Sequence, residues 1–254
     1  MIDAADVEAI ERATIAALPP EAVIEIGGWL VALGAGAARR SKSAVPLSHE
    51  LAADAAALDA IEAAYAERGL TPGFRICDGP GLDGVRAALA DRGYRPEQPT
   101  LVKVGDVAGM RQVCGGEPAE VIASPDESWK AVFLGPGFDP ADGASRIDLL
   151  TRSGENRFGA VRDAAGAALA VGVASFGDGW ASVHGMRTAA AHRGQGLAGR
   201  VLAGLAQSAE DRGLTRVFLQ VEEPNAPARS LYRRAGFRPA WRYFYWSKPP
   251  GQGA

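Results

Sequence analysis

A glycine-rich segment toward the C-terminal end has the composition of a phosphate-binding turn. Gly194, Gly196 and Gly199 lie where the chain turns from a predicted strand over 180–187 into a predicted helix over 196–212. Small residues let a ligand approach the backbone, and the free N–H groups at a helix start favour an anion. The spacing is neither the G-x-G-x-x-G of a dinucleotide fold nor a P-loop ending in G-K-[ST]. The segment therefore predicts a pyrophosphate site, and the alternative is a glycine-rich helix start that binds nothing.

An internal repeat indicates how the rest of the chain is organised. The pattern R-G-L-T-x-x-F occurs at 68–74 and again at 212–218, an offset of 212 − 68 = 144 residues. A Gly-aromatic-Arg-Pro pattern occurs at 93–96 and 236–239, an offset of 236 − 93 = 143 residues. We interpret the two matches as a duplication. The alternative is a pair of unrelated helix ends, because glycine commonly follows a helix.

Hydrophobic periodicity and chain breakers predict helices and strands in both halves, 1–112 and 113–254, with 105–118 as a linker. This mixture indicates an α/β (α+β) fold. In the first half we expect helices over 3–18, 52–68 and 82–92, and strands over 23–33, 37–47, 74–77 and 100–104. In the second half we expect helices from 125 and over 142–152, 196–212 and 226–235, and strands over 119–123, 158–162, 167–176, 180–187, 218–221 and 242–247.

Composition and charge exclude several classes of protein. The 254 residues include 27 Lys and Arg and 30 Asp and Glu, a net charge of −3, which disfavours non-specific binding of nucleic acid. Two cysteines and three histidines are scattered without ligand spacing, so we expect no metal site. The acidic N-terminus lacks a signal-peptide pattern and no stretch suits a bilayer. We therefore expect no membrane contact and a cytoplasmic location.

Two segments of the second half are together similar to a known family. Residues 193–198 (RGQGLA) fit the R/Q-x-x-G-x-G/A signature of the GNAT superfamily of acyl-CoA N-acyltransferases. Residues 219–232 reproduce its L-x-V-x-x-x-N-x-x-A-x-x-L-Y pattern, and Gly236-Phe237 completes the usual ending. The resemblance covers about residues 118–248. Ala190 departs from it, because proline is common at that position.

The first half resembles, more loosely, the degenerate half of tandem GNAT proteins, through 39–43 (RRSKS) and 65–70 (YAERGL). An offset of 144 residues places 48–54 (SHELAAD) opposite the glycine-rich turn; it has no glycine, and its two carboxylates would repel a pyrophosphate. Alignment of Gly93 with Gly236 places Leu89 opposite Tyr232.

The resemblance implies two GNAT-like domains in tandem, each a mixed, mostly antiparallel central sheet flanked by helices. Residues 1–112 would be a degenerate, non-catalytic GNAT-like domain, and residues 113–254 the catalytic acetyltransferase domain.

The resemblance also implies that acetyl-CoA is the cosubstrate and that no metal takes part. Met186 and Thr188 would pair with the pantetheine arm through their main chains, like an added strand. Asn225 would bond the arm near the sulfur; the alternative, a cap on the following helix, is compatible with that role. Arg193, like Arg200, would either meet phosphates or be a solvated helix charge. Backbone amides would hold the pyrophosphate at Gln195, Gly196, Leu197, Ala198 and Gly199.

Three residues are candidates for proton transfer. The resemblance implies that Tyr232 donates a proton to the leaving thiolate; the alternative is a core aromatic residue. Since an amine is mostly protonated at neutral pH, another group must take a proton, and His184 and Glu222 are the candidates. The alternative for His184 is a satisfied buried histidine. Gly185 permits a β-bulge that would free a backbone N–H for the thioester oxygen.

The reaction that these residues imply is direct attack of a primary amine on acetyl-CoA. We expect the acceptor to be a small molecule or an amino acid, with a protein or peptide acceptor as the alternative within enzymes. A non-catalytic acyl-CoA-binding sensor is the alternative outside enzymes. We expect a monomer or a homodimer. Aromatic and basic side chains near the expected acceptor pocket are Trp129, Phe133, Phe138, Arg242, Tyr243 and Tyr245.

Overall fold

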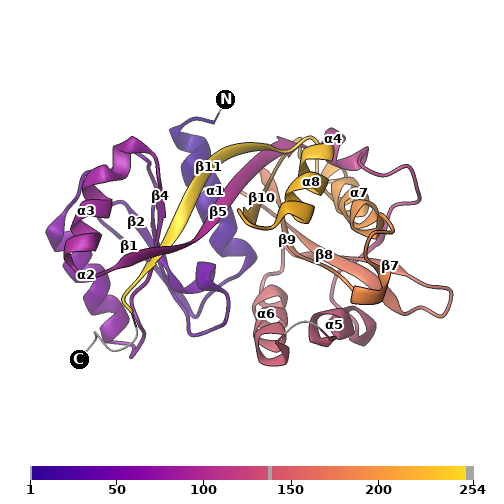
Figure 1. Ribbon diagram of the computed structural model, residues 1–254, viewed down its shortest axis with the longest axis horizontal. Coiled ribbons are helices and arrows are strands. Elements are labelled where there is room, and N and C mark those ends of the chain that lie inside the picture. The colour runs from indigo at the N-terminus through magenta and orange to yellow at the C-terminus, as the bar shows by residue number, and fades with distance from the viewer. Residues whose placement is uncertain (1, 137–138, 250–254) are drawn as a thin grey trace.

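A single mixed sheet runs through the whole molecule in the computed structural model, which describes residues 2–136 and 139–249 (Figure 1). Its strands lie in the order β1-β2-β3-β4-β11-β5-β10-β9-β8-β7-β6. Most neighbours are antiparallel, as the sequence predicts. The strands are β1 Ala22–Ile26, β2 Trp29–Leu33, β3 Ala44–Pro46, β4 Phe74–Cys77, β5 Arg95–Asp106, β6 Glu120–Ile122, β7 Arg157–Arg162, β8 Ala168–Gly177, β9 Trp180–Thr188, β10 Arg216–Glu222 and β11 Arg238–Ser247.

Helices cover both faces of this sheet, so that β8 and β9 pass between α7 on one side and α5 and α6 on the other (Figure 1). Most helices begin at an Asp or Asn whose side chain accepts a bond from a backbone N–H of the first turn. The helices are α1 Ala4–Ala17, α2 Ala55–Ala66, α3 Asp83–Asp91, α4 Val107–Arg111, α5 Glu127–Leu134, α6 Pro140–Arg152, α7 Leu197–Glu210 and α8 Ala226–Arg234.

The last strands of the two halves are exchanged. β5, from the first half, pairs with β10 from Thr100 to Asp106, and it also pairs with β11. β11, from the second half, pairs on its other edge with β4 of the first half. Strands from both sides of the predicted boundary near residue 112 therefore alternate within one sheet. The division of the sequence into two domains, 1–112 and 113–254, stays a prediction.

Three segments differ from the sequence-based expectation. The predicted strand over 23–33 is a hairpin of β1 and β2. The predicted strand over 37–47 is a 3-10 helix at Arg39–Lys42 followed by the short strand β3. In this 3-10 helix the two consecutive arginines have different surroundings: Arg39 pairs with Glu97 at 2.6 Å, and Arg40 lines a cavity. The predicted linker over 105–118 contains α4, because the Asp106 side chain accepts a bond from the Gly109 N–H at 2.6 Å and starts a helix.

Only two neighbouring strand pairs among the described residues are parallel, and each lies in one half. β3 and β4 meet at a single position, Ala44 opposite Phe74. β9 and β10 pair from Ala181 opposite Val217 to Val183 opposite Leu219, after which no pairing follows. Parallel strands that part in this way open a wedge in the sheet, and a cavity lined by residues of both strands lies at the wedge between β9 and β10.

The first half also packs across the sheet of the second half. α1 lies against β8, β9 and β10: the Gln220 amide donates to the Thr14 hydroxyl at 3.0 Å, and Arg216 pairs with Asp6. The first half thus closes one face of the sheet that carries the cavity.

Candidate active site

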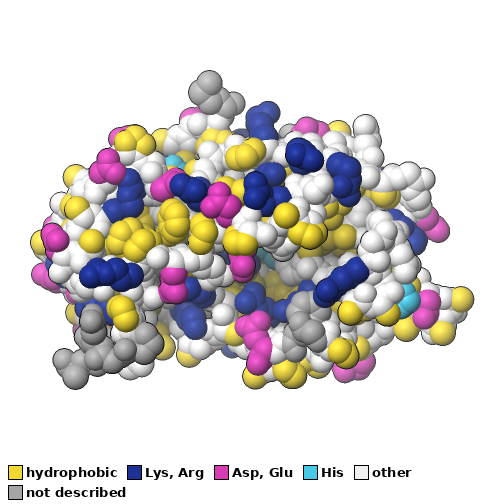
Figure 2. Space-filling view, viewed as in Figure 1, with side chains coloured by type: hydrophobic (Ala, Val, Ile, Leu, Met, Phe, Trp, Pro, Cys, Tyr) yellow, Lys and Arg dark blue, Asp and Glu magenta, His cyan; other side chains and the backbone are white. Residues whose placement is uncertain are grey.

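One cavity of about 1180 Å³ gathers every residue that the sequence singles out for chemistry. Figure 2 shows this face hollowed between α8 and α6, with basic side chains around the opening. The cavity is lined by β9, the turn after it, α7, β10 and α8, and also by Arg40 and residues 113–116. The predicted residues that line it are Tyr232, His184, Glu222, Met186, Thr188, Arg193, Gln195, Gly196, Leu197, Ala198, Gly199 and Asn225.

The start of α7 forms one end of the cavity and is open to a ligand. Gly196 is its N-cap, with φ +76°, and no side chain bonds the first N–H groups of the helix. A side chain at Gly194 or Gly196 would meet no protein atom within 4 Å, so the backbone there faces free space. The first N–H groups of a helix have no intrahelical acceptor. The predicted phosphate-binding turn is therefore exposed, unfilled by protein groups and built from amides.

The segment between the two halves forms one wall of this turn. Val113 and Cys114 lie against Gly199, where an added Cβ would stand 3.5 Å from the Cys114 Cβ. The Arg200 guanidinium donates to the Glu117 carbonyl at 2.6 Å, which holds this segment against α7. Sequence reasoning missed this wall, because a stretch without periodicity carries no signal of what it touches.

The predicted β-bulge in β9 is confirmed. Val171 lies opposite Arg187 and Val173 lies opposite His184, so that Gly172 alone faces two residues, Gly185 and Met186. Gly185 has φ +57°, and a Cβ there would lie 2.9 Å from the Phe133 ring, which only glycine tolerates. The bulge gives β9 one residue more than β8 has at this point, beside the wedge between β9 and β10.

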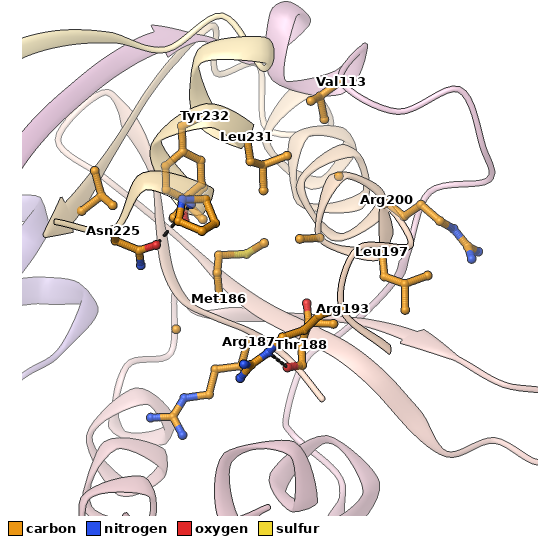
Figure 3. A pocket seen from close by; sticks show the side chains of 18 of the residues that line it. Val113, Met186, Arg187, Thr188, Arg193, Leu197, Arg200, Asn225, Leu231 and Tyr232 are labelled. Carbon is orange, nitrogen blue, oxygen red and sulfur yellow. Dashed lines mark hydrogen bonds between the residues drawn. The ribbon is translucent and has the colours of Figure 1, made fainter. Parts of the chain in front are cut away.

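Tyr232 and Asn225 reach the cavity from the two ends of α8 (Figure 3). Tyr232 is 7% exposed, and burial raises the pKa of its hydroxyl to about 12, so it keeps its proton at neutral pH. The Asn225 Oδ1 accepts a bond from the Ala228 N–H at 3.2 Å, which confirms the predicted cap. The cap uses the acceptor of the amide, so the same side chain can still donate from Nδ2.

His184 and Glu222 differ in their surroundings. His184 is buried, with Nε2 2.8 Å from the Ser182 hydroxyl and Nδ1 3.5 Å from the Arg40 guanidinium. Burial, and then the charge of Arg40, lower the pKa of His184 well below 6.5. The imidazole is therefore neutral at neutral pH and a weak base. Glu222 is exposed at the end of β10, and its Oε1 accepts a bond from Gln98 at 2.8 Å.

Of the aromatic residues expected near an acceptor pocket, Phe133 lines the cavity, and Trp129 is stacked behind it at a ring separation of 4.6 Å. Phe138 lies outside the described residues. The other three do not line the cavity, because β11 sits on the far side of β5: Arg242 pairs with Asp78, and Tyr243 and Tyr245 are buried against each other.

Arg40 lines the cavity although it lies far from the second half in sequence. The basic run at 39–43 is visible in the sequence, but its position over β9 and β10 depends on the packing of the two halves. Residues 2–136 and 139–249 contain no cluster of three or more His, Cys, Asp or Glu side chains arranged for a metal ion. They also contain no helix long and apolar enough to span a bilayer.

Comparisons with known sequences agree with the predicted family. The profile of a family described as probable histone acetyltransferase Rv0428c C-terminal matches residues 4–246. A curated relative, the uncharacterized N-acetyltransferase YobR of Bacillus subtilis (strain 168), is 37% identical over 76 residues. That match covers 30% of this chain and 31% of YobR, so the chain matches less than a third of the length of that relative.

Solved structures share the fold over nearly the whole chain. A GCN5-related N-acetyltransferase from Kribbella flavida has a TM-score of 0.72 at 21% identity and covers 96% of each chain. A tandem GNAT protein from the clavulanic acid biosynthesis pathway has a TM-score of 0.64 at 18% identity, covering 98% of this chain and 89% of its own. These likenesses confirm the predicted mixed α/β fold.

The profile and the curated relative carry acetyltransferase or N-acetyltransferase names, which supports the predicted enzyme class. Since the profile spans far more than half of the sequence, this chain belongs to the family described as probable histone acetyltransferase Rv0428c C-terminal.

Proposed function

We propose that the protein transfers an acetyl group from acetyl-CoA to a primary amine of a small molecule or amino acid, in the cavity between β9 and β10. The observation that carries this proposal is the convergence of an uncapped helix start, a bulged strand edge and a protonated tyrosine in one cavity. The uncapped start of α7 supplies amides for the pyrophosphate. The edge of β9 from Met186 to Thr188 supplies main-chain groups for the pantetheine arm.

The chemistry follows from the positions of the two protonic groups. The amine nitrogen, in its neutral form, attacks the thioester carbonyl carbon and forms a tetrahedral intermediate. The C–S bond then breaks, the amide forms, and Tyr232 gives its proton to the departing thiolate. The ammonium proton goes to a base. Glu222 suits that role better than His184, because the exposed carboxylate can reach substrate through water, whereas both ring nitrogens of the buried His184 lie against protein groups, Ser182 and Arg40.

A protein acceptor is the second candidate, because the matching family is described as a probable histone acetyltransferase. The charges of the cavity argue against a lysine-rich tail. The lining contains six arginines and one carboxylate, Glu222, so a chain of ammonium groups would be repelled. A sensor that binds acyl-CoA without catalysis is the third, and the presence of Tyr232 favours an enzyme, since binding alone needs no proton donor.

Calorimetry with acetyl-CoA, followed by a thiol-release assay with a panel of amines, tests the proposal. We expect one acetyl-CoA per chain, bound in the second half, and thiol release that depends on the amine. Two equivalent sites per chain would contradict the assignment of the first half as non-catalytic. Binding without thiol release for every amine, basic peptides included, would favour the sensor. A cytoplasmic location and a monomeric or homodimeric state stay predictions.

A further inference from the structure

Arg40 reaches from the first half to the point where β9 and β10 part. The last paired residues of these parallel strands are Val183 and Leu219. The next residues along the two strands are His184 and Gln220, and the Arg40 guanidinium lies against both. The side chain thus stands over the opening of the wedge, inside the cavity and on the face that α1 covers.

The contacts of Arg40 leave its charge unpaired. Its Nη1 lies 3.5 Å from the His184 Nδ1 and 3.4 Å from the Gln220 Oε1, both neutral groups at the limit of hydrogen bonding. Within residues 2–136 and 139–249, no carboxylate lies within 4.0 Å of it. Its neighbours in sequence and in space are paired: Arg39 with Glu97 at 2.6 Å, and buried Arg75 with Glu11 at 2.5 Å. A half-buried guanidinium offers a fork of donors that matches a carboxylate.

The remaining charges of the cavity divide into two groups. Arg193, Arg200 and Arg234 lie around the start of α7 and the end of α8, where the phosphates of acetyl-CoA would be held. Arg187 points away from Arg200, toward α6 (Figure 3).

On that side, Arg146 and Arg187 share one carboxylate, Asp142, at 2.8 Å and 4.0 Å. Arg40, Arg146 and Arg187 thus all line the cavity away from the phosphate-binding turn, and two of them have Asp142 as a shared partner. Burial and the charge of Arg146 lower the pKa of Arg187 to about 10, which agrees with an excess of positive charge.

A simple alkylammonium ion would enter this region against repulsion, whereas an acceptor that brings its own negative charge would not. Glu222 lies two residues beyond Gln220 on the same face of β10, roughly 7 Å along the strand. The carboxylate of Glu222 suits the amine end of an acceptor, and Arg40 suits a negatively charged end. On the basis of the proposed acetyl transfer, we propose that the acceptor is an amino acid and that Arg40 binds its carboxylate.

Matched pairs of acceptors test this proposal with the unmodified protein. Each pair joins an amino acid to the amine that lacks its carboxylate: L-lysine with cadaverine, L-phenylalanine with phenethylamine, and L-methionine with 3-(methylthio)propylamine. We expect kcat/KM to favour the amino acid of at least one pair by about tenfold or more, as a charge-assisted bond to a half-buried guanidinium predicts. Equal or better use of the decarboxylated amine in every pair overturns the proposal.

The variant Arg40→Gln separates carboxylate binding from a structural role. We expect it to lower kcat/KM for the preferred amino acid by about 10- to 100-fold, mainly through KM, and to change that of the decarboxylated partner less than about threefold. Arg40→Lys should recover part of the preference, since it keeps the charge and loses the fork. Lys42→Gln is the matched control: it removes one positive charge from the same 3-10 helix, does not line this cavity, and should leave the preference unchanged.

Equal losses with both members of the pair in Arg40→Gln would show a structural role and overturn the proposal. Thiol release with a basic histone-tail peptide but with no amino acid would overturn it too, while acetyl transfer would stand. A protein that fails to bind acetyl-CoA in calorimetry would instead remove the proposed function itself.

Discussion

Each half of the chain has a helix that follows a strand, α2 in the first half and α7 in the second, and the two helices differ at their N-terminal ends. In the second half, the N-cap of α7 is Gly196, which has no side chain, and no side chain caps the first N–H groups of the helix. In the first half, α2 begins at Asp54, whose carboxylate accepts a bond from the Ala56 N–H at 3.0 Å. A helix start becomes an anion site only where the chain does not fill it with its own anion.

A second difference lies where a proton donor is needed. Tyr232 of α8 lines the cavity with a hydroxyl that stays protonated. Leu89 of α3, its counterpart in the predicted repeat, is fully buried and has no proton to give. At the positions that the predicted repeat aligns with Tyr232 and with the phosphate-binding turn, the first half has neither chemical group. It contributes instead a strand, β5, a covering helix, α1, and one guanidinium, Arg40.

The largest expected effect comes from separating the halves. β5 pairs with β10 on one edge and with β11 on the other, so residues 113–254 alone lose the strand between their last two. We expect that fragment to lack a cooperative unfolding transition and to show no acetyl transfer. Co-expression of 1–112 with 113–254 should restore both. Circular dichroism melting and the thiol-release assay measure this, and a stable, active 113–254 fragment would show that the halves are independent.

Tyrosine-to-phenylalanine changes compare the halves at a single hydroxyl. Tyr232→Phe should lower turnover by roughly 10²- to 10⁴-fold with acetyl-CoA binding largely kept, because it removes the proton donor and almost no packing. Tyr65→Phe in the first half is the control. It removes a bond to the Ala32 carbonyl at 2.8 Å and should cost about 1 kcal/mol of stability without affecting turnover. A turnover of Tyr232→Phe within a few-fold of the parent would leave Tyr232 as a packing residue.

Valine at two glycines of similar backbone conformation, one in each half, tests the phosphate-binding turn. Gly196 and Gly69 have φ +76° and +64°, and neither has a protein atom within 4 Å of an added Cβ, so Gly196→Val and Gly69→Val carry similar backbone strain, about 1–2 kcal/mol. Only Gly196→Val adds bulk where a pyrophosphate would lie. We expect its acetyl-CoA Kd to rise at least about tenfold and that of Gly69→Val to stay near the parent value. Equal Kd values by calorimetry would place the phosphate site elsewhere.

The smallest expected effect concerns the pH dependence of stability. Burial holds the pKa of His184 well below 6.5 in the folded protein. Below about pH 6.5, the imidazole is therefore protonated in the unfolded chain but stays neutral in the folded one. Its contribution to stability is therefore complete above about pH 6.5 and falls as pH drops, by up to about 1.4 kcal/mol per pH unit. His184→Gln should flatten the slope of the free energy of unfolding against pH, as measured by urea titrations between pH 7 and 5.

His49 of the first half provides the comparison, because burial lowers its pKa too. Part of the slope should therefore remain in His184→Gln and should disappear only when His49→Gln is added. An unchanged slope in both variants would show that neither imidazole is excluded from protonation.

The sequence alone determined the local features of this protein. The glycine-rich helix start, the cap at Asn225, the bulge at Gly185 and the tyrosine in α8 each depend on residues within a few positions of one another. Such features follow from backbone conformation and helix capping, which the local sequence largely sets. The fold class followed as well, because periodicity and a specific motif both indicated it.

Only the tertiary structure decided how the halves share one sheet and one cavity. The exchange of β5 and β11 depends on which strand edges meet, and alternating side chains alone do not specify a partner. The run at 39–42 looks like the start of a strand until packing against β9 and β10 leaves Arg40 over the wedge. The position of Arg40 depends on contacts between residues that are more than a hundred positions apart in the sequence. Local sequence patterns do not predict such long-range contacts.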